Sequence, residues 1–230
     1  MSGLVAAIAP EEAAAVSADE VEARAGLILA LRRQGIGAHA VLSAIERVPR
    51  RLFLSARHHR LAYEDSLIPI ECGQSVLAPS YVAMVVQALE IASDHSVLEV
   101  GTGSSYQAAV LGHLAARVES LERYRTLVEL AEQRIAALRL RSVVIHHADG
   151  FAGMRSKAPY DRIVLNGAVE EIPEVLLEQL SHRGMLIAPV GAPGTVQQLV
   201  RIARTDAGDI RHVIGSARTV SLTPGLAKRL

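Results

Sequence analysis

The spacing of apolar residues predicts two helices near the N-terminus, over residues 17–35 and 38–48. Ser17 or Asp19 can cap the first helix, because either side chain can accept a hydrogen bond from a free backbone N–H group of the first turn. The second helix is expected to stop before Pro49, since the residue that precedes a proline is disfavoured in the helical region.

The pattern changes after the second predicted helix. Residues 50–80 are irregular and hold a single strand-like run, over residues 66–70. Short apolar runs then alternate with helical stretches. The expected strands are 96–100, 117–121, 142–147, 161–166 and 185–190, and the expected helices are 81–91, 106–115, 126–138 and a short one from Pro173. This alternation predicts right-handed βαβ units, and therefore an α/β fold with a mostly parallel sheet and helices on both faces.

The last quarter of the chain has a different pattern. Residues 196–203, 210–216 and 219–222 are strand-like, and a polar turn over residues 205–208 joins the first two runs. Strands joined by a tight polar turn are typical of an antiparallel hairpin. We therefore expect a C-terminal antiparallel portion beside the parallel sheet.

The sequence predicts one domain preceded by a short segment. A chain of 230 residues can bury roughly 70–75% of its unfolded surface, which is enough for one sizeable core. Residues 1–18 are expected to form an N-terminal tail or short helix, and residues 19–230 a single domain. Within that domain, residues 19–80 form an N-terminal helical segment, residues 81–191 the ligand-binding core and residues 192–230 the C-terminal strands.

Charge and composition exclude some classes of partner. The chain has 24 Lys+Arg and 24 Asp+Glu, so its formal net charge is zero. A neutral chain has no long-range attraction to nucleic acid or to an anionic membrane. Aromatic residues make up only 3%, which leaves few rings for base stacking. Cys72 is the single cysteine, and no stretch approaches about 18 uninterrupted apolar residues. We predict a cytoplasmic protein without nucleic-acid or membrane partners.

A glycine-rich turn is the strongest local signal for a ligand. Glu99, Gly101, Thr102 and Gly103 lie where the expected strand 96–100 gives way to a helix. Glycines there let a ligand approach the backbone, and the helix start offers free N–H groups. A dinucleotide-binding turn has glycine at the sixth position of its motif, where this chain has Tyr106. The acid before the turn would repel a diphosphate and favour a cationic ligand.

Acidic residues also follow the next two expected strands. Glu122, with Arg123 after it, lies about 20 residues past Gly103, where nucleotide-binding folds bind a ribose diol with a carboxylate. Asp149, followed by Gly150, is placed to accept from an adenine amino group. Each residue has a simpler interpretation, a solvated helix-cap charge for Glu122 and an Asp-Gly turn for Asp149. Together, acids at three strand ends favour S-adenosyl-L-methionine, which carries an ammonium and a sulfonium but no phosphate, over NAD.

Metal binding and nucleophilic catalysis are not predicted. The histidine pairs at 58–59 and 146–147 lack cysteine or carboxylate partners at metal-ligand spacing, so the predicted metal site is none. Ser104 and Ser105 lack the G-x-S-x-G pattern that exposes a serine nucleophile.

The chain resembles the protein-L-isoaspartate O-methyltransferase family from about residue 24 to residue 223. The matching segments include Arg47-Val48-Pro49-Arg50, Ala62-Tyr63-Glu64-Asp65, Gly73-Gln74-Ser75, Glu99-Val100-Gly101-Thr102-Gly103, Glu122-Arg123 and Asp149-Gly150. The resemblance implies a Rossmann-like methyltransferase fold with extra N-terminal helices and S-adenosyl-L-methionine as cofactor. It implies an isoaspartyl-containing protein or peptide as substrate, whose abnormal α-carboxylate is methylated to begin repair. The residues assigned to cofactor binding are Glu99, Gly101, Thr102, Gly103, Glu122, Arg123, Asp149 and Gly150.

The acceptor side departs from the family pattern. The family's Thr-Ile-Ser segment reads Ser75-Val76-Leu77 here, so its active-site serine falls on Leu77, which cannot donate to a carboxylate. This chain has Ser105 where the family's turn has its third glycine. It has Asn166-Gly167-Ala168-Val169 where the family has Thr-Ala-Ala-Ala. We predict that Ser75 or Asn166 orients the acceptor and that cofactor binding is retained.

Two alternatives to isoaspartyl methylation stay open. The chain could methylate a different carboxylate, or it could bind S-adenosyl-L-methionine without catalysis. A carboxylate is already ionised at neutral pH and needs no general base, so residues that orient the acceptor matter more than a catalytic triad. The sequence does not predict the oligomeric state.

Overall fold

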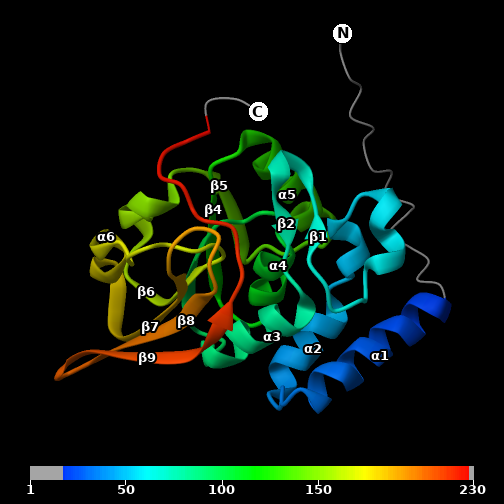
Figure 1. Cartoon of the computed structure of the whole chain (residues 1–230), viewed down its shortest axis with the longest axis horizontal. Coiled ribbons are helices and arrows are strands. Elements are labelled where there is room, and N and C mark those ends of the chain that lie inside the picture. The colour runs from blue at the N-terminus through cyan, green and yellow to red at the C-terminus, as the bar shows by residue number, and fades with distance from the viewer. Residues whose placement is uncertain (1–17, 228–230) are drawn as a thin grey trace, which may run out of the picture.

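The computed structural model describes residues 18–227, so residues 1–17 of the predicted N-terminal tail lie outside the described part. Within that part, Figure 1 shows a seven-stranded sheet with the N-terminal helices gathered at one side. The strands are β3 (Ser96–Val100), β4 (Arg117–Glu122), β5 (Val143–His147), β6 (Tyr160–Leu165), β7 (Leu180–Val190), β8 (Gln197–Thr205) and β9 (Gly208–Ala217). Their order is β5-β4-β3-β6-β7-β8-β9, parallel from β5 to β7 and antiparallel from β7 to β9. The predicted fold class is confirmed.

Helices cover both faces of the sheet. The core on the first face is built from α1 (Ala18–Arg33), α2 (His39–Arg47), α3 (Pro79–Ala88), α4 (Tyr106–Gly112) and α5 (Arg125–Ala137). Of these helices, α4 and α5 contact β4 and β5, whereas α1 and α2 pack on neighbouring helices. The second face packs against α6 (Glu174–Glu178) and neighbouring loops. Val97 and Val164 point to the first face, and Leu98 and Ile163 to the second. Alternate residues are thus buried on opposite sides, which explains why these strands read as continuous apolar runs.

The irregular region between α2 and α3 contains short elements that the apolar pattern did not resolve. It holds the 3₁₀ helices η2 (Arg50–Phe53), η3 (Ala56–Leu61) and η4 (Glu71–Gly73). The run predicted over residues 66–70 becomes β1 (Ile68–Pro69), which pairs antiparallel with β2 (Ser75–Val76). Elements of two to six residues are too short to show a clear periodicity, so sequence pattern could not locate them.

The strand predicted over residues 219–222 is not formed. That segment makes one isolated bridge, in which Ser221 lies parallel to Ala168. Ala168 N donates to Val220 O, and Leu222 N donates to Ala168 O, both at 2.8 Å. The strand prediction was therefore wrong: among residues 18–227, the backbone of this segment pairs only with the backbone of Ala168, in the loop after β6. We call residues 218–223 the C-terminal strap.

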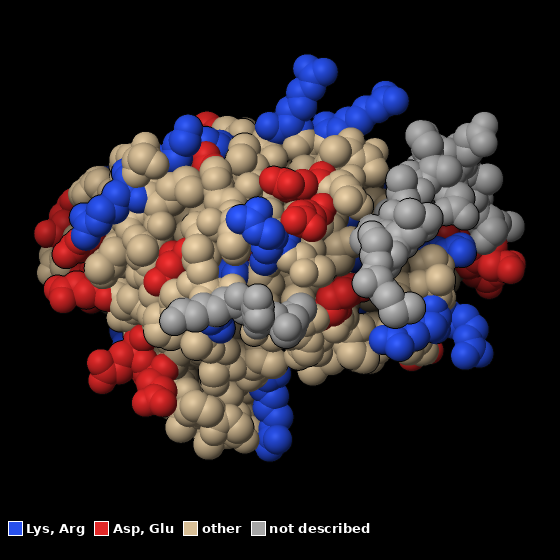
Figure 2. All heavy atoms as spheres, turned by 90° about the horizontal axis from the view of Figure 1, so that it is seen from above, with Lys and Arg blue, Asp and Glu red and all other residues tan. Residues whose placement is uncertain are grey.

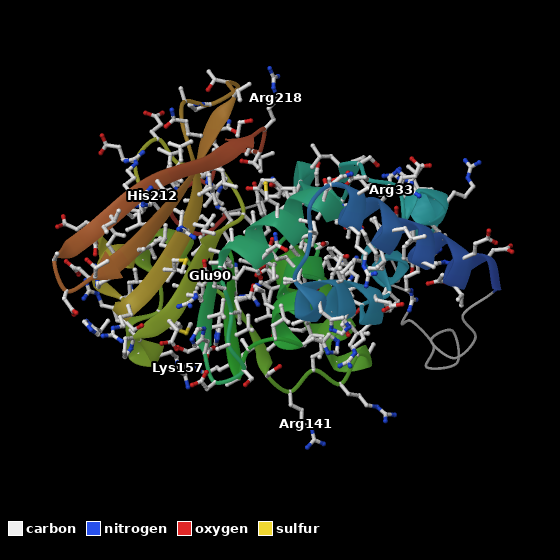
Figure 3. All side chains as sticks on the ribbon, turned by 90° about the horizontal axis from the view of Figure 1, so that it is seen from below. Arg33, Glu90, Arg141, Lys157, His212 and Arg218 are labelled. Carbon is white, nitrogen blue, oxygen red and sulfur yellow. The ribbon has the colours of Figure 1, made fainter. Side chains whose placement is uncertain are left out.

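No helix among residues 18–227 is long and apolar enough to span a membrane. Figure 2 shows acidic and basic side chains interspersed over one face, and Figure 3 shows Arg33, Arg141 and Arg218 extending away from the ribbon. On the face shown in Figure 2, the neutral net charge therefore reflects mixed signs rather than two separated poles.

The side chain of Arg50 holds the irregular region together. Arg50 is fully buried in η2, and its terminal nitrogens donate to four main-chain carbonyls. The acceptors are the oxygens of Ala62 (2.9 Å), Glu64 (3.2 Å), Ser66 (3.0 Å) and Leu77 (3.0 Å). Taking a guanidinium out of water costs several kcal/mol unless its N–H groups are bonded. These bonds therefore fix the path of the chain on both sides of the β1–β2 hairpin.

Replacing Arg50 by Gln should lower the free energy of unfolding by about 3 kcal/mol, because an amide cannot reach all four carbonyls. Urea unfolding followed by circular dichroism measures the loss. Arg57→Gln is the matched control, since Arg57 lies in η3 and is exposed, and it should change stability by less than about 0.5 kcal/mol. Equal effects of the two substitutions would contradict the role given to Arg50.

Candidate functional site

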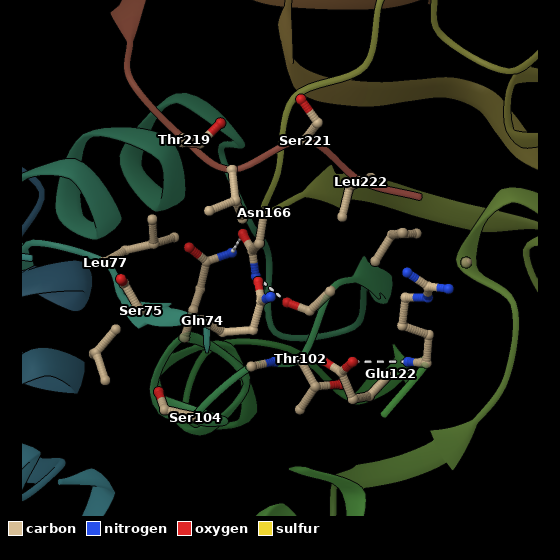
Figure 4. Close-up of a pocket in the computed structure, with 18 of the residues that line it drawn as sticks. Gln74, Ser75, Leu77, Thr102, Ser104, Glu122, Asn166, Thr219, Ser221 and Leu222 are labelled. Atoms are coloured by element: carbon tan, nitrogen blue, oxygen red, sulfur yellow. Dashed lines mark hydrogen bonds between the residues drawn. The ribbon is translucent and has the colours of Figure 1, made fainter. Parts of the chain in front are cut away.

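A cavity of about 360 Å³ opens at the carboxyl ends of the parallel strands. The turn after β3, the end of β4 and the start of η5 (Gly150–Ala152) line one part of it. β2, the residue after it, and the C-terminal strap line the other part. Figure 4 shows Ser75 and Leu77 at one side of the cavity, Glu122 at the opposite side and Asn166 between them. The strand order reverses between β3 and β6, and such switch points are where open α/β sheets bind ligands.

Main-chain N–H groups hold the Glu122 carboxylate in place. Its Oε1 accepts from Arg123 N (2.8 Å) and Tyr124 N (3.0 Å), and its Oε2 accepts from Gly103 N (2.8 Å). A carboxylate offers about four acceptor positions, so one position on Oε2 stays free. Glu122 is 5% exposed and lines the cavity. The structure thus presents a fixed acceptor whose remaining position, among the hydrogen bonds of the described residues, is on Oε2.

The turn between β3 and α4 takes its shape from left-handed residues and from β4. Gly101 and Gly103 have φ of 88° and 53°, values that glycine adopts without strain. Gly101 N and Thr102 N both donate to Leu121 O. The backbone of this turn therefore lies against β4, and all three residues from 101 to 103 face the cavity, as the sequence predicted for a ligand-binding turn.

Glu99 lies beneath the cavity and not in its wall. Its carboxylate is fully buried, and it is not among the residues that line the cavity. Ser120 Oγ on β4 donates to its Oε2 (2.5 Å), and Asn166 Nδ2 after β6 donates to its Oε1 (2.8 Å). Because the Ser120 hydrogen is used here, Thr102 Oγ1 donates to Ser120 Oγ (2.6 Å). Glu99 thus links β3 to β4 and to the loop after β6. The sequence predicted that Glu99 contacts the cofactor, but the structure places its carboxylate behind the residues that line the cavity.

Burial raises the pKa of Glu99 to about 7, and the nearby charge of Glu122 acts in the same direction. The hydrogen bonds from Ser120 and Asn166 oppose this shift, because they stabilise the ionised form. Glu99 therefore changes its charge near neutral pH at the centre of the site.

The Asn166 amide is also engaged by the protein. Its Nδ2 donates to Glu99 Oε1 and to Gly101 O (3.0 Å), and its Oδ1 accepts from Gln107 Nε2 (2.7 Å). Both amide hydrogens are therefore used, and the donor to an acceptor carboxylate that the sequence suggested at this position is not free. The sequence analysis did not identify Gln107 as a residue of the site. The available signal was a polar residue within an otherwise apolar helix, and the structure shows that Gln107 is buried there.

Ser75 keeps its hydroxyl available. Its Oγ makes no hydrogen bond to any residue of the described part of the chain, and the residue lines the cavity beside Leu77. Gln74 Nε2, the neighbouring amide, is bonded to Cys72 O (3.1 Å). Of the two acceptor-orienting residues suggested by the sequence, Ser75 is the one whose polar atom is unengaged.

Asp149 and Gly150 contribute differently to the site. Asp149 Oδ1 accepts from Phe151 N (2.9 Å) and caps η5, and Asp149 itself is not among the cavity-lining residues. A Cβ on Gly150 would overlap the Val100 side chain, so β3 and η5 can approach only with glycine there. Asp149 thus forms a cap on the turn, the simpler interpretation of the sequence, while Gly150 and Phe151 line the cavity.

The C-terminal strap closes the cavity from above and was missed as a site element. Besides its pairing with Ala168, the chain beyond the strap is held by Arg123, whose Nε donates to Gly225 O (3.0 Å) and whose carbonyl accepts from Ala227 N (3.1 Å). A Cβ on Gly167 would lie 2.8 Å from Val220 O and from the Leu222 side chain. The strap can therefore lie this close only because residue 167 has no side chain.

In residues 18–227, no three His, Cys, Asp or Glu side chains gather as a metal site would require. His146, one of the paired histidines, instead forms a 2.6 Å contact between its Nε2 and Glu119 Oε2. This contact joins β5 to β4.

Comparison with known proteins agrees with this geometry. The family model described as protein-L-isoaspartate(D-aspartate) O-methyltransferase (PCMT) matches residues 22–226. A protein named protein-L-isoaspartate O-methyltransferase from Xanthobacter autotrophicus is 46% identical over 214 residues, which covers 93% of this chain and 98% of that protein. A protein of the same name from Azorhizobium caulinodans is 48% identical and covers 90% and 95%.

Solved structures show the same architecture. A protein-L-isoaspartate O-methyltransferase superposes with a TM-score of 0.81 at 25% identity, over 88% of this chain and 67% of that chain. A putative enzyme of this kind from Plasmodium falciparum, in complex with S-adenosyl-L-homocysteine, gives a TM-score of 0.75 at 22% identity and covers 86% and 97%. At that identity the second likeness supports the fold.

The raised pKa of Glu99 predicts a pH-dependent stability. An acid whose pKa is higher in the folded state stabilises the fold below its unfolded value, and this contribution is lost as the pH rises through the folded value. The free energy of unfolding of the wild-type protein should therefore fall, relative to that of Glu99→Gln, as the pH rises from 4.5 to about 7. The lower limit is the ordinary pKa of glutamate, and the upper limit is the pKa of Glu99 in the folded protein. Urea unfolding of both proteins at about pH 5 and about pH 8 measures the difference. A difference that stays constant over this range would contradict the titration.

Proposed function

Because the chain belongs to the protein-L-isoaspartate O-methyltransferase family, we propose that it transfers a methyl group from S-adenosyl-L-methionine to the α-carboxylate of L-isoaspartyl residues in damaged proteins and peptides. The resemblance in the sequence to this family is confirmed by the family match and by relatives that cover nearly the whole chain. One observation of the structure supports the activity most directly. A single cavity joins the glycine turn and Glu122 to the segment of Ser75 and Leu77.

The residues of the cavity fit S-adenosyl-L-methionine. The free position of Glu122 Oε2 can accept from a ribose hydroxyl, and the open space at Gly103 leaves the backbone accessible. Leu121 and Phe151 supply apolar walls for a purine. When bound, this cofactor supplies a methyl group already activated by a sulfonium.

The remaining task of the protein is to orient the acceptor. A carboxylate is ionised at neutral pH, so no general base is required. The Ser75 hydroxyl can donate to one carboxylate oxygen, while the apolar lining residues Leu77 and Val220 can exclude water from the cavity. Holding the reacting groups in line and away from water can supply several kcal/mol of rate acceleration.

Leu77 supports a second candidate, a methyltransferase for another carboxylate. The family's serine would donate a hydrogen bond from this position, and Leu77 cannot. One missing bond to a charged acceptor costs on the order of 1.5–3 kcal/mol. The missing bond is therefore compatible with a weaker isoaspartyl activity, or with a different acceptor that has more apolar surface.

We also propose that the protein acts in the cytoplasm, since its lone Cys72 suits a reducing compartment.

Replacing Glu122 by Gln should weaken binding of S-adenosyl-L-homocysteine about tenfold to a hundredfold. The amide would direct a donor at backbone N–H groups that now donate to a carboxylate. Isothermal titration calorimetry measures the affinity. The control is Glu129→Gln on the exposed side of α5, which should leave affinity unchanged. Unchanged binding by the Glu122 variant would remove this residue from the cofactor site.

The wild-type chain should methylate an isoaspartyl peptide and not the same peptide with a normal aspartyl residue. Leu77→Ser should raise kcat/KM for the isoaspartyl peptide about tenfold or more, because it restores one donor to a charged acceptor. Transfer of a labelled methyl group measures both rates. Leu67→Ser is the control, since Leu67 lines the cavity but is 52% exposed at its rim. If neither wild type nor Leu77→Ser methylates the peptide, isoaspartyl methylation is contradicted, which leaves a different carboxylate acceptor or binding of S-adenosyl-L-methionine without catalysis.

A further inference from the structure

Arg134 occupies a position in α5 where an apolar residue is expected. The buried face of this helix consists of Leu127, Val128, Ala131, Arg134 and Ile135, spaced as one helical stripe. Arg134 is only 5% exposed. Removing a guanidinium from water is costly, and a leucine or methionine would pack there at no such cost. The interaction that Arg134 makes must therefore be one that apolar packing cannot replace.

That interaction is with the glycine-rich turn on the neighbouring element. Arg134 NH1 donates to Ser104 O at 3.1 Å, a buried contact between residues 30 positions apart in the chain. No backbone N–H of the described residues donates to this carbonyl, although Ser105 Oγ does. Arg134 thus supplies the long-range partner that fixes the direction of the peptide between Ser104 and Ser105.

Ser105 is the residue for which this direction matters. It has φ of 68° and ψ of 11°, a left-handed conformation in a fully buried residue at the start of α4. A residue with a side chain is strained there by about 1–2 kcal/mol, whereas glycine is not. The glycine that would remove the strain is absent from this position of the chain. The left-handed turn therefore needs an external restraint, and the Arg134 hydrogen bond is placed to supply it.

The turn that Arg134 restrains carries the contacts of the cofactor site. Gly103 N, which donates to Glu122 Oε2, lies one residue before Ser104. Ser105 N closes the turn on Thr102 O (2.9 Å), and Tyr106 N donates to Ser104 Oγ (3.2 Å). A rotation of the Ser104–Ser105 peptide would move this whole set of donors.

Arg134 also faces the acceptor side of the molecule. Burial lowers the pKa of Arg134, while the negative charge of Glu71 in η4 opposes that shift. Glu71 precedes β2 by a few residues, and Ser75 and Leu77 lie on the segment that β2 begins. The helix that carries Arg134 therefore contacts η4, which precedes the acceptor-side segment, while the Arg134 guanidinium itself bonds the glycine-rich turn.

We propose that Arg134 is a positioning residue for cofactor binding, which holds the Ser105 turn in the left-handed conformation that this chain adopts without glycine. The inference rests on the proposed function in one respect, that the cavity binds S-adenosyl-L-methionine. Arg134 acts through the backbone of Ser104, and its effect depends on which residue stands at position 105.

A double-mutant cycle between Arg134 and Ser105 tests this dependence. Arg134→Gln should weaken S-adenosyl-L-homocysteine binding about tenfold or more, as measured by calorimetry. In the Ser105→Gly background the same substitution should weaken it by less than about threefold, because glycine holds the turn without help. Arg141→Gln, whose side chain extends into solvent in Figure 3, should have no effect in either background.

Kinetics and amide exchange separate positioning from general stability. Arg134→Gln should raise KM for S-adenosyl-L-methionine while kcat at saturation stays within about twofold of wild type. In the absence of cofactor, amide exchange of residues 101–109 should be faster in this variant and return toward wild type with Ser105→Gly. Arg134→Lys, which keeps one cationic donor, should give intermediate affinity, and it serves as the test if the glutamine variant does not fold.

The outcomes distinguish the inference from the proposed function. If the wild-type protein does not bind S-adenosyl-L-homocysteine, the proposed function fails and the positioning role fails with it. If wild type binds and the Arg134 variants bind equally well, the inference alone is overturned. An equal loss of affinity in the wild-type and Ser105→Gly backgrounds also overturns it, because Arg134 would then act by packing and not through the turn.

Discussion

The buried carboxylate of Glu99 is the interaction on which the site is built. It lies at the end of the central strand β3 and receives hydrogen bonds from β4 through Ser120 and from the loop after β6 through Asn166. Three neighbouring strand ends are thereby tied to one group. Asn166 extends the network to Gly101 and Gln107, and Ser120 extends it to Thr102. A buried charge tolerates little displacement of its partners, so this network fixes the strand ends relative to one another.

The two sides of the cavity are organised by the same physical device. On the acceptor side, fully buried Arg50 bonds main-chain carbonyls on either side of the β1–β2 hairpin. On the cofactor side, buried Arg134 bonds the carbonyl of Ser104. Arginine suits both places because its planar group carries several donors in fixed directions. Irregular loops make few apolar contacts that could stabilise them. Every loop does have backbone carbonyls, however, and these can accept hydrogen bonds from a buried arginine.

Part of this arrangement follows from the sequence. The apolar runs near residues 96–100 and 161–166 predicted parallel strands, because strands covered on both faces are apolar throughout. The glycines at 101 and 103 predicted a turn that a ligand can approach, and both line the cavity. The strand prediction over residues 219–222 was wrong. Alternation shows that a chain is extended, but it does not show whether a neighbouring strand is available for pairing.

Side-chain roles were harder to predict than positions. Glu99, Glu122 and Asp149 were all placed correctly at strand ends, and the structure gives each a different task. Glu122 lines the cavity, Glu99 braces the strands below it, and Asp149 caps a short helix. The difference depends on which backbone N–H groups and polar side chains surround each carboxylate. Those neighbours come largely from other elements and cannot be read from local spacing.

The sequence by itself determined the parallel sheet, the antiparallel hairpin beside it, the edge of the sheet where the cavity opens, and the family. These features depend on the periodicity of apolar residues and on short motifs, which are local properties of the chain. Only the tertiary structure decided that Asn166 has no amide hydrogen left for a substrate, that Ser75 has a hydroxyl unengaged by the described residues, and that the strap closes the cavity over Gly167. Hydrogen-bond donors and acceptors are saturated by whichever groups lie within about 3 Å, and distances of that kind exist only after the chain has folded.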